Sequence, residues 1–232
     1  MHEDLEKVYA LWGTEQSRDL LLAEWKALNE TVKQLKKEQD AQTEAIQHLV
    51  QQHEALTARE REANRKIDRY TKRRQKAQQA IDTGTATDFG MALEQVRVCT
   101  ELTDEEETEL LLTLDELDNT EGLTVSARLV NAQLSEKLDA ATAVRDERKP
   151  SLKVEFDAAT TERDAGRQGI WRDLLNRYDR LRAKRLMVFA NVVSGQCSGC
   201  WVTVPSEVVS AHRRAAEVGV CKNCGRFMGQ VT

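Results

Sequence analysis

The sequence has few aromatic residues, few prolines and no long apolar run. Aromatic side chains make up 5% of its 232 residues, only two prolines occur, and 31% of the residues are charged. Such a composition argues against a single large globular core. No apolar stretch approaches the ~20 residues that a membrane span needs, and the first residues, Met1 to Asp4, do not begin a secretory signal. We therefore expect a cytoplasmic protein that does not insert into a membrane.

Signatures of catalysis are also lacking. The sequence has no Gly-rich phosphate-binding loop, no recognisable pair of nucleophile and base, and no set of metal ligands that leaves a position open for a substrate. We therefore expect neither an enzyme with catalytic residues nor a small-molecule substrate. The net charge of −5 also disfavours nucleic acid as the main partner.

Four of the five cysteines form two C-x-x-C pairs. Cys197 pairs with Cys200 and Cys221 with Cys224, and twenty residues separate the two pairs. This spacing suits one tetrahedral site in which four thiolates bind Zn²⁺. Because all four ligands are cysteines, no position is left for water, and we predict one structural Zn²⁺. Two such loops facing each other make a zinc ribbon.

Other interpretations of these cysteines remain open, namely two disulfides, a thioredoxin-like redox pair, or unrelated buried thiols. Gly199 and Gly225 favour tight turns at both pairs, with backbone amides that can point at the sulfurs. A redox motif normally opens a helix, whereas residues 202–205 are typical of a short strand that ends at Pro205. Cys99 lies far away in a helical pattern, where we expect a small, buried or half-buried side chain.

A heptad pattern runs through the first third of the chain. From residue 21 to residue 81 the pattern alternates steps of four and three, which is typical of a coiled-coil seam. Upstream, Leu5, Val8 and Leu11 form an apolar stripe in another phase, and the register changes at Gly13, where we expect a stutter or a local break. The predicted seam positions are Leu21, Trp25, Leu28, Val32, Leu35, Gln39, Gln42, Ile46, Leu49, His53, Leu56, Glu60, Ala63, Ile67, Tyr70, Arg74, Ala77 and Ile81.

The first pattern stops in a segment rich in turn residues, 82–88. Gly84 can end a helix there, and Thr87 or Asp88 can cap the next one. A second heptad set follows, so we expect the chain to double back as a long antiparallel helical hairpin. The predicted seam positions of the second helix are Phe89, Leu93, Val96, Thr100, Leu110, Leu114 and Leu117.

Charge along the two predicted helices supports their pairing. Residues 61–76 contain eight Lys or Arg and two acids, whereas residues 101–121 contain ten acids and no basic residue. Folding near residue 85 sets position i opposite roughly 170 − i, which brings much of the acidic run beside the basic one.

Two residues could interrupt the second helix. Gly122 could relax or kink it, and Pro150 removes a backbone N–H and should bend it, with helix on both sides. A last apolar stripe, which includes Ile170 and Tyr178, leads toward residue 187. We therefore predict a mostly α-helical protein with two domains, an antiparallel coiled-coil hairpin at residues 1–186 and a C4 zinc-ribbon domain at residues 187–232.

The order of these features resembles the bacterial C4-type zinc-ribbon coiled-coil family. The resemblance rests on the long hairpin, on residues 174–178 after it, on the first cysteine pair followed by Val204 and Pro205, and on the run from Cys221 to Arg226. It implies a non-enzymatic adaptor or regulator that binds proteins, among them an alternative sigma factor or components of flagellar or type III secretion machinery. Binding of messenger RNA, which the resemblance also implies as a known behaviour, keeps nucleic acid open as a partner.

Nucleic-acid binding is the alternative function, since zinc ribbons often touch DNA or RNA. Residues 165–232 contain eleven Lys or Arg against four acids, although four thiolates and one Zn²⁺ together subtract about two charges from this excess. A solvated basic face explains the same composition without a ligand. The candidate contacts are Arg213, Arg214, Lys222 and Arg226 in the ribbon and Lys72, Arg73, Arg74 and Lys76 near the turn.

Overall fold

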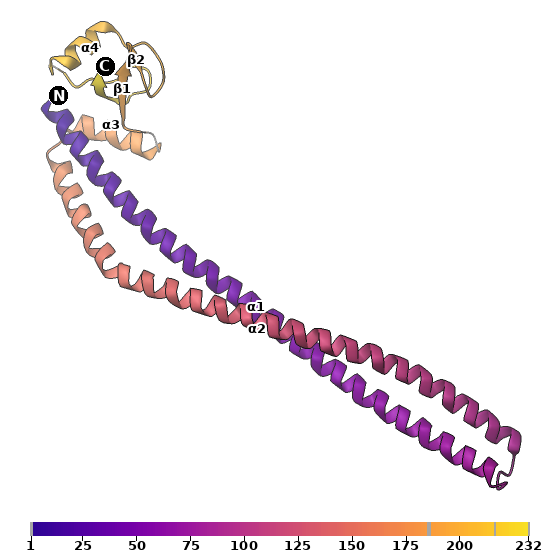
Figure 1. Cartoon of the computed structure of the whole chain (residues 1–232). Helices are drawn as coiled ribbons and strands as arrows, with labels where there is room; N and C mark the ends of the chain where they lie inside the picture. Colours follow the sequence, from indigo (N-terminus) through magenta and orange to yellow (C-terminus); the bar gives the residue numbers. More distant parts are fainter. Residues whose placement is uncertain (1, 185–186, 216, 232) are drawn as a thin grey trace. The chain divides into compact units, whose positions relative to one another are not determined.

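A computed structural model describes residues 2–184, 187–215 and 217–231 (Figure 1). The chain is mostly helical, with two long antiparallel helices that pack against each other and a small C-terminal region of strands near four cysteines. This arrangement confirms the predicted fold class. The elements are α1 (Glu3–Asp82), α2 (Phe89–Gln168), α3 (Arg172–Ala183), β1 (Phe189–Val193), β2 (Gln196–Cys197), α4 (Ser206–Arg213) and β3 (Phe227–Val231).

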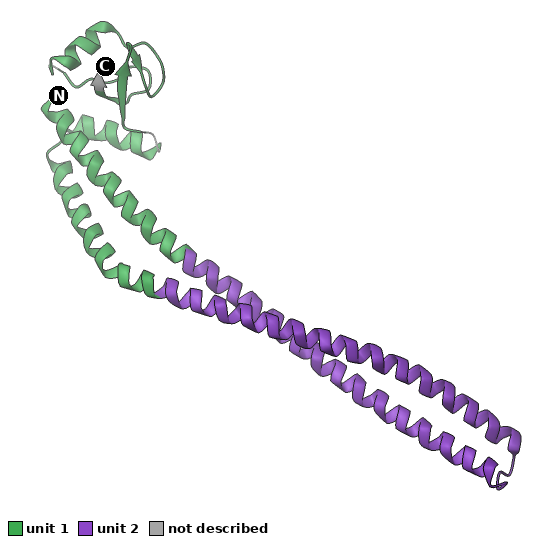
Figure 2. Ribbon diagram, in the orientation of Figure 1, with its two compact units in different colours: residues 1–30, 143–232 green, residues 31–142 purple. Residues whose placement is uncertain are grey.

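The chain divides into two compact units (Figure 2). Unit 1 comprises residues 1–30 and 143–232, so it contains the start of α1, the end of α2 and all later elements. Unit 2 comprises residues 31–142, which form the rest of the two long helices and the turn between them. The predicted domain boundary at residue 186 lies outside the described residues.

The seam of α1 follows the predicted heptads. Every predicted position from residue 21 to residue 81 is buried or half-buried, and Ala63 and Ala77 are the most enclosed at 5% and 6% exposure. Gln42, a polar seam residue, donates from Nε2 to the carbonyl oxygen of Ala127 on α2 at 3.2 Å. This contact agrees with the predicted pairing of i with roughly 170 − i, so the register of the hairpin is confirmed.

The seam of α2 differs from the prediction. Phe89, Leu93 and Leu114 are exposed, whereas the other predicted positions, Val96, Thr100, Leu110 and Leu117, are half-buried. The buried positions of α2 are instead Cys99, Thr103, Thr113, Thr120 and Thr124, with Leu152 farther along the helix. Each of these threonine hydroxyls donates to the carbonyl four residues earlier in its own helix, as Thr113 does to Glu109 at 2.8 Å. The hydroxyl therefore has a partner without leaving the helix, and the methyl group packs in the seam.

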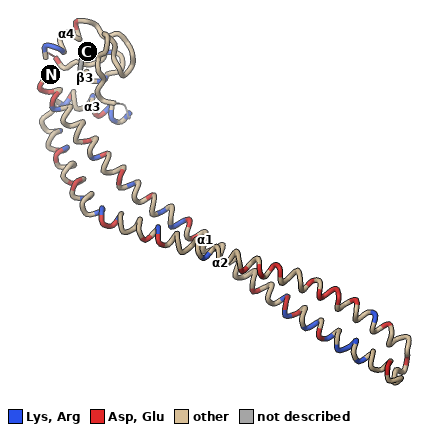
Figure 3. The backbone as a smooth tube through the Cα atoms, in the orientation of Figure 1, with Lys and Arg blue, Asp and Glu red and all other residues tan. Residues whose placement is uncertain are grey.

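Opposite charges pair across the two helices of unit 2. Lys66 Nζ lies 2.9 Å from Oε1 of Glu106, and Arg59 forms ion pairs with Glu109 and Glu116. In Figure 3, which colours the backbone by residue type, basic residues follow α1 and acidic residues follow α2 along the stretch that approaches the turn. The predicted pairing of the basic and acidic runs is therefore confirmed. Exposed pairs of this kind add little stability each, but their number favours this alignment of the helices over others.

The turn between the helices is formed by the predicted residues. Gly84 has a φ of 66°, a left-handed conformation that favours glycine. Its N–H donates to the carbonyl of Ile81 at 3.1 Å, and the N–H of Thr85 donates to the carbonyl of Ala80 at 3.0 Å, which are the two hydrogen bonds of a Schellman motif. Asp88 then caps α2, because its Oδ1 accepts a backbone N–H of the first helical turn at 3.0 Å.

Both long helices continue through residues that weaken helices. α1 runs through Gly13, and α2 runs through Gly122 and Pro150. The local break considered at Gly13 is therefore absent, and the change of register there marks the point where the apolar stripe of α1 changes its packing partners. Helix on both sides of Pro150 agrees with the prediction.

The core of unit 1 joins the first residues of the chain to the strands. Leu5 and Val8 of α1 are fully buried in one cluster with Tyr178 of α3, Phe189 of β1 and Phe227 of β3. The strands form one sheet in the order β2-β1-β3, with β1 antiparallel to β2 and parallel to β3. The start of α1 therefore packs against the small sheet whose loops carry the cysteines.

Candidate metal centre

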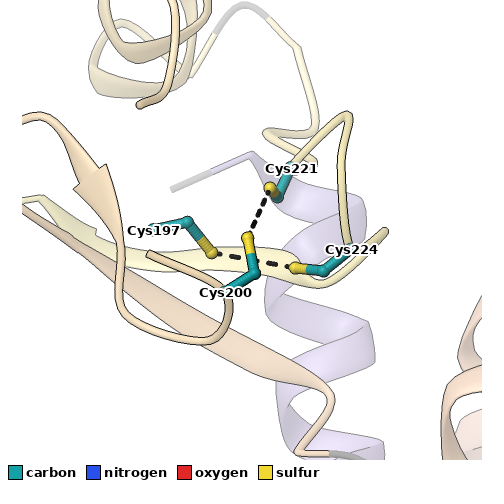
Figure 4. A group of neighbouring side chains, drawn as sticks. All are labelled: Cys197, Cys200, Cys221 and Cys224. Carbon is teal, nitrogen blue, oxygen red and sulfur yellow. Dashed lines mark hydrogen bonds between the residues drawn. The ribbon is translucent and has the colours of Figure 1, made fainter. Parts of the chain in front are cut away.

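Two loops bring the cysteines of the C-x-x-C pairs together (Figure 4). Cys197 ends β2 and Cys200 follows in a turn, whereas Cys221 and Cys224 lie in the segment that leads into β3. All four sulfurs lie within 4.8 Å of one another. Sγ of Cys197 is 3.8 Å from Sγ of Cys224, and Sγ of Cys200 is 3.7 Å from Sγ of Cys221. The structure thus brings together the four residues that the sequence indicated as metal ligands.

These distances fit a metal ion at the centre of four thiolates. A tetrahedron of sulfurs placed about 2.3 Å from a Zn²⁺ has edges of about 3.8 Å. The two sulfurs of a disulfide lie about 2.05 Å apart, so all four cysteines are free thiols in this structure. Within the described part of the chain, this is the single group of three or more His, Cys, Asp or Glu with ligand atoms close enough to hold a metal ion.

The two cysteine loops have the same backbone construction. After the second cysteine of each pair the chain adopts a left-handed conformation, with a φ of 59° at Trp201 and 74° at Gly225. The N–H of each residue donates to the carbonyl of the first cysteine, at 2.7 Å to Cys197 and 2.8 Å to Cys221. Glycine adopts this conformation freely, whereas another residue costs about 1–2 kcal/mol. Sequence reasoning predicted the turn at Gly225 but had no signal for Trp201.

Arg226 holds the first cysteine loop against the chain that enters the ribbon. Its Nε donates to the carbonyl of Met187 at 2.9 Å, and its Nη1 donates to the carbonyl of Gly199 at 2.5 Å. A Cβ at Gly199 would lie 2.6 Å from Nη1, so glycine is required for this close approach. The guanidinium also places a positive charge beside a site that carries thiolates. Arg226, a candidate for nucleic-acid contact, thus binds carbonyls of its own chain.

The surroundings move the pKa values of two thiols in opposite directions. Burial is the main cause that raises the pKa of Cys197, which is 3% exposed. Hydrogen bonds from the side chain of Asn223 and from the backbone N–H of Val202 lower the pKa of Cys200. A bound cation would displace the thiol protons of the site, because metals bind the thiolate form.

The segment between the two cysteine pairs differs from the prediction. The expected strand at residues 202–205 is wrong, because only Thr203 forms a bridge, with Gln196, before α4 begins. Near the end of α4, His212 is 7% exposed and its Nε2 lies 2.9 Å from the carbonyl oxygen of Gly229. Sequence reasoning missed this helix because eight residues are too few to show a helical period.

A cavity of about 790 Å³ lies in unit 1 between the start of α1, β1 and α4. Its walls include the rings of Tyr9, Trp12 and Phe189, whose centroids lie between 5.1 and 5.6 Å apart. Arg213 also lines it and forms no ion pair within the described residues. Aromatic walls with a few polar groups are typical of ligand pockets. This cavity could not be predicted from the sequence, since its aromatic residues come from distant segments.

The basic candidates for nucleic-acid contact lie in both units. In unit 1, Arg213, Arg214 and Lys222 are exposed. In unit 2, Lys72 forms an ion pair with Asp68 at 2.6 Å. The other candidates of unit 2 are the exposed Arg73 and Lys76 and the half-buried seam residue Arg74. Nucleic-acid contact by these residues stays a prediction.

The fold and its cysteine site place the chain in a class of helical hairpin proteins that carry a small four-cysteine strand region. No family model matches the sequence, and no curated protein matches it. Solved structures do match. The structure of CT398 from Chlamydia trachomatis is similar, with a TM-score of 0.75 and 15% sequence identity over 99% of this chain and 98% of that chain. The HP0958 protein from Helicobacter pylori is similar with a TM-score of 0.65 and 11% identity over 98% of this chain and 97% of that chain. At these identities the likeness concerns the fold alone.

The described helices show one further property that bears on function. Within the described ranges, every helix is too short or too polar to cross a lipid bilayer.

Proposed function

We propose that the chain is a non-enzymatic adaptor or regulator that holds one structural Zn²⁺ and binds other proteins. The observation that carries the proposal is the meeting of four cysteine sulfurs within 4.8 Å at the end of a long helical hairpin. Four thiolates fill a tetrahedral site and leave no position for a substrate. The ion therefore stabilises a small folded surface, and the long helices offer further surface for partners.

Zn²⁺ is the metal that this set of donors favours. Four thiolates in a tetrahedron suit Zn²⁺ or an iron–sulfur centre, and the separation of the two C-x-x-C pairs by twenty residues is typical of zinc ribbons. When bound, Zn²⁺ supplies folding free energy by joining the two cysteine loops. Cys197, Cys200, Cys221 and Cys224 would be its ligands.

Elemental analysis of protein purified under reducing conditions tests the metal. We expect about one Zn²⁺ per chain, and we expect Cys197→Ser to lose it while the helical circular dichroism signal is largely kept, because the seam of unit 2 does not depend on the ion. Cys99→Ala is the matched control, since Cys99 lies in the seam of α2. Zinc near zero in the parent protein, or equal zinc in Cys197→Ser, contradicts the assignment.

Transcription and secretion proteins are the partners that we propose, and the resemblance to the C4-type zinc-ribbon coiled-coil family supports this choice. Purified alternative sigma factor and purified flagellar or type III secretion components from the source organism can be titrated into the full chain by calorimetry. We expect at least one of them to bind, and Cys197→Ser to weaken the partner that uses the ribbon. Absence of binding by all of these proteins argues against the proposed partner class.

Nucleic-acid binding is a second candidate, which the exposed Arg213, Arg214 and Lys222 favour. Binding through phosphates would weaken as salt rises, by roughly 0.9 in the log–log slope for each phosphate neutralised on duplex DNA. Alanine at Arg213, Arg214 and Lys222 should then abolish it, while Arg226, which holds the first cysteine loop, is kept. Tight, salt-sensitive RNA or DNA binding that this variant loses, together with no protein partner, favours the second candidate over the first.

A further inference from the structure

The exposed apolar residues of unit 2 are distributed unequally between its two helices. All of the large apolar side chains that are exposed between residues 31 and 142 belong to α2, and none belongs to α1. They are Phe89, Met91, Leu93, Val98, Leu111, Leu112, Leu114, Leu123, Val125, Leu129 and Val130. The surface of α1 is thus polar, whereas α2 keeps apolar side chains in water that its pairing with α1 does not use.

Four of these residues form a stripe along one side of α2. Leu111, Leu114, Val125 and Leu129 are exposed at 68%, 41%, 52% and 62%, and we call them the outer stripe. Steps of three, eleven and four residues separate them, so they lie on one face of a helix. Leu111 and Leu129 lie away from the seam, which contains Thr113. Leu114 and Val125 flank the seam, and Val125 lines a small hollow together with Val50 of α1. At 1.5 Å per residue, about 16 Å separates Leu114 from Val125.

Unpaired carboxylates lie between the two halves of the outer stripe. Asp115, Asp118 and Glu121 occupy the same face, are exposed, and form no ion pair within the described residues. Their neighbours Glu109 and Glu116, by contrast, pair with Arg59 of α1. This face of α2 therefore presents an apolar pair, an acidic band and a second apolar pair in sequence, with the exposed Arg128 between the two members of the second pair.

Gly122 opens the middle of this face to close approach. No atom lies within 4 Å of the position that a Cβ would take at Gly122, and the residue is exposed. The backbone of a partner can therefore approach α2 more closely at Gly122 than at positions that carry a long side chain.

From this arrangement we infer that the outer stripe binds a basic amphipathic helix of a protein partner. That helix carries two apolar anchors, each one helical turn or less in length. One anchor packs on Leu111 and Leu114, and the other packs on Val125 and Leu129. Lys or Arg side chains between the anchors face Asp115, Asp118 and Glu121. The inference rests on the proposed adaptor function, since it names the chemistry of one partner of that adaptor.

The partner segment is a helix because unit 2 offers no edge of a sheet. Unit 2 consists of parts of two helices and their turn, and helices satisfy their own backbone hydrogen bonds. An extended segment packed on them would leave its N–H and C=O groups without protein partners, whereas a helical segment brings its own.

Charge and exposure disfavour a second copy of the chain as the occupant. The exposed surface of α1 in unit 2 carries no large apolar side chain to cover the stripe. Two copies of α2 packed antiparallel about Asp118 would match Leu111 with Val125 but would also bring two acidic bands together. Nucleic acid and anionic lipid meet the same repulsion.

A designed peptide tests the inference without a known partner. The probe is a helical peptide of about 22 residues with two leucine pairs at the spacing of the outer stripe and lysines between them, and its control is a scrambled peptide of the same composition. We expect the full-length chain to bind the patterned peptide at least about tenfold more tightly than the scrambled one in fluorescence anisotropy.

Paired variants locate the site. Leu111→Ser with Val125→Ser should weaken the patterned peptide about tenfold or more, whereas Leu20→Ser with Val154→Ser, which changes two residues of unit 1 exposed at 71% and 69%, should leave it unchanged. Asp115→Asn, Asp118→Asn and Glu121→Gln together should lower both the affinity and its dependence on salt. Circular dichroism checks that each variant is folded.

Several results would overturn the inference. Equal affinity for both peptides means attraction by charge alone, and equal affinity of the two serine variants places the site elsewhere. A dimer in sedimentation that Leu111→Ser with Val125→Ser dissolves makes the occupant a second copy. If sigma factor or secretion components bind the parent chain and this variant equally, the proposed function stands and the outer stripe fails. If the patterned peptide binds while none of those proteins does, the outer stripe stands as a binding surface and the proposed partner class fails.

Discussion

The hydroxyl of Tyr178 donates a hydrogen bond to Oε2 of Glu15 at 2.7 Å, which joins α3 to α1 inside unit 1. The same oxygen accepts from Nε of Arg182 at 3.0 Å, and Arg167 lies 3.6 Å from the other oxygen of Glu15. Tyr178 is fully buried. Burial first, and then its contacts with Glu15, raise the pKa of Tyr178 far above its ordinary value. The phenol is therefore held in its neutral, donating form.

Tyr178→Phe should lower the free energy of unfolding of unit 1 by about 1–3 kcal/mol, because a hydrogen bond to a charged acceptor is lost while the ring still fills its place. Urea unfolding followed by tryptophan fluorescence measures the change. Tyr9→Phe is the control, since Tyr9 is 49% exposed and its ring packing is kept. Equal stability of parent and Tyr178→Phe would mean that the contact with Glu15 contributes nothing.

The stability that Tyr178 contributes should also depend on pH. Below about pH 10 the phenol is neutral in the folded and the unfolded chain, and its contribution is complete. Above that pH the unfolded phenol ionises while the folded one keeps its proton, because its pKa is raised, so the unfolded state gains stability. The difference in unfolding free energy between the parent and Tyr178→Phe should therefore narrow from about pH 10 upward. A constant or widening difference refutes this linkage.

The seam of α2 can be tested with one pair of neighbours. Thr113→Asp should destabilise unit 2 by at least about 2 kcal/mol, because Thr113 is buried and a carboxylate there would lack a partner. Leu114→Asp should cost less than about 1 kcal/mol, since Leu114 is 41% exposed, even though leucine loses more helix propensity than threonine does on change to aspartate. Thermal unfolding by circular dichroism compares the two. A larger loss of stability for Leu114→Asp than for Thr113→Asp would instead favour the seam predicted from the heptads alone.

The two cysteine loops should respond oppositely to changes at their left-handed residues. Gly225→Ala should cost about 1–2 kcal/mol, because alanine does not favour a φ of 74°. Trp201→Gly should hold the metal at least as well as the parent, since it removes the same strain at a residue that is 71% exposed. Competition with a chelator measures both. Gly122→Ala is the control, because it changes an open helical position away from the site. A loss of metal in Trp201→Gly like that in Gly225→Ala would contradict the shared construction.

The periodic parts of the fold could be predicted from the sequence. Steps of four and three along α1 located its whole seam, and Gly84 with Asp88 located the turn, because helix ends and heptads depend on local chemistry. The seam of α2 could not be found in this way. Several of its leucines, such as Leu114, are exposed while four of its threonines are buried. The hydrogen bond from Thr113 to Glu109 that makes this possible is invisible to a count of apolar residues.

The metal ligands were likewise predictable, whereas the residues that shape and hold the cysteine loops were not. Spacing identified Cys197 and its three companions because four ligands of one ion must lie in two short loops. The left-handed Trp201 and the contact of Arg226 with Gly199 depend on tertiary packing, and a sequence carries no local mark of either. The same holds for the outer stripe, which becomes visible only once the true seam of α2 is known.

The core of unit 1 has a consequence for the order of folding during synthesis. Leu5 and Val8 are made early, yet the cluster that buries them includes Phe227, which is made about 220 residues later. At about 5–20 residues per second, these apolar side chains wait roughly ten seconds or more for their partner. The hairpin of unit 2 needs only residues up to 142 and can pair during that interval. A nascent chain therefore passes through a stage in which its coiled coil is formed and its first helical turns still expose apolar surface.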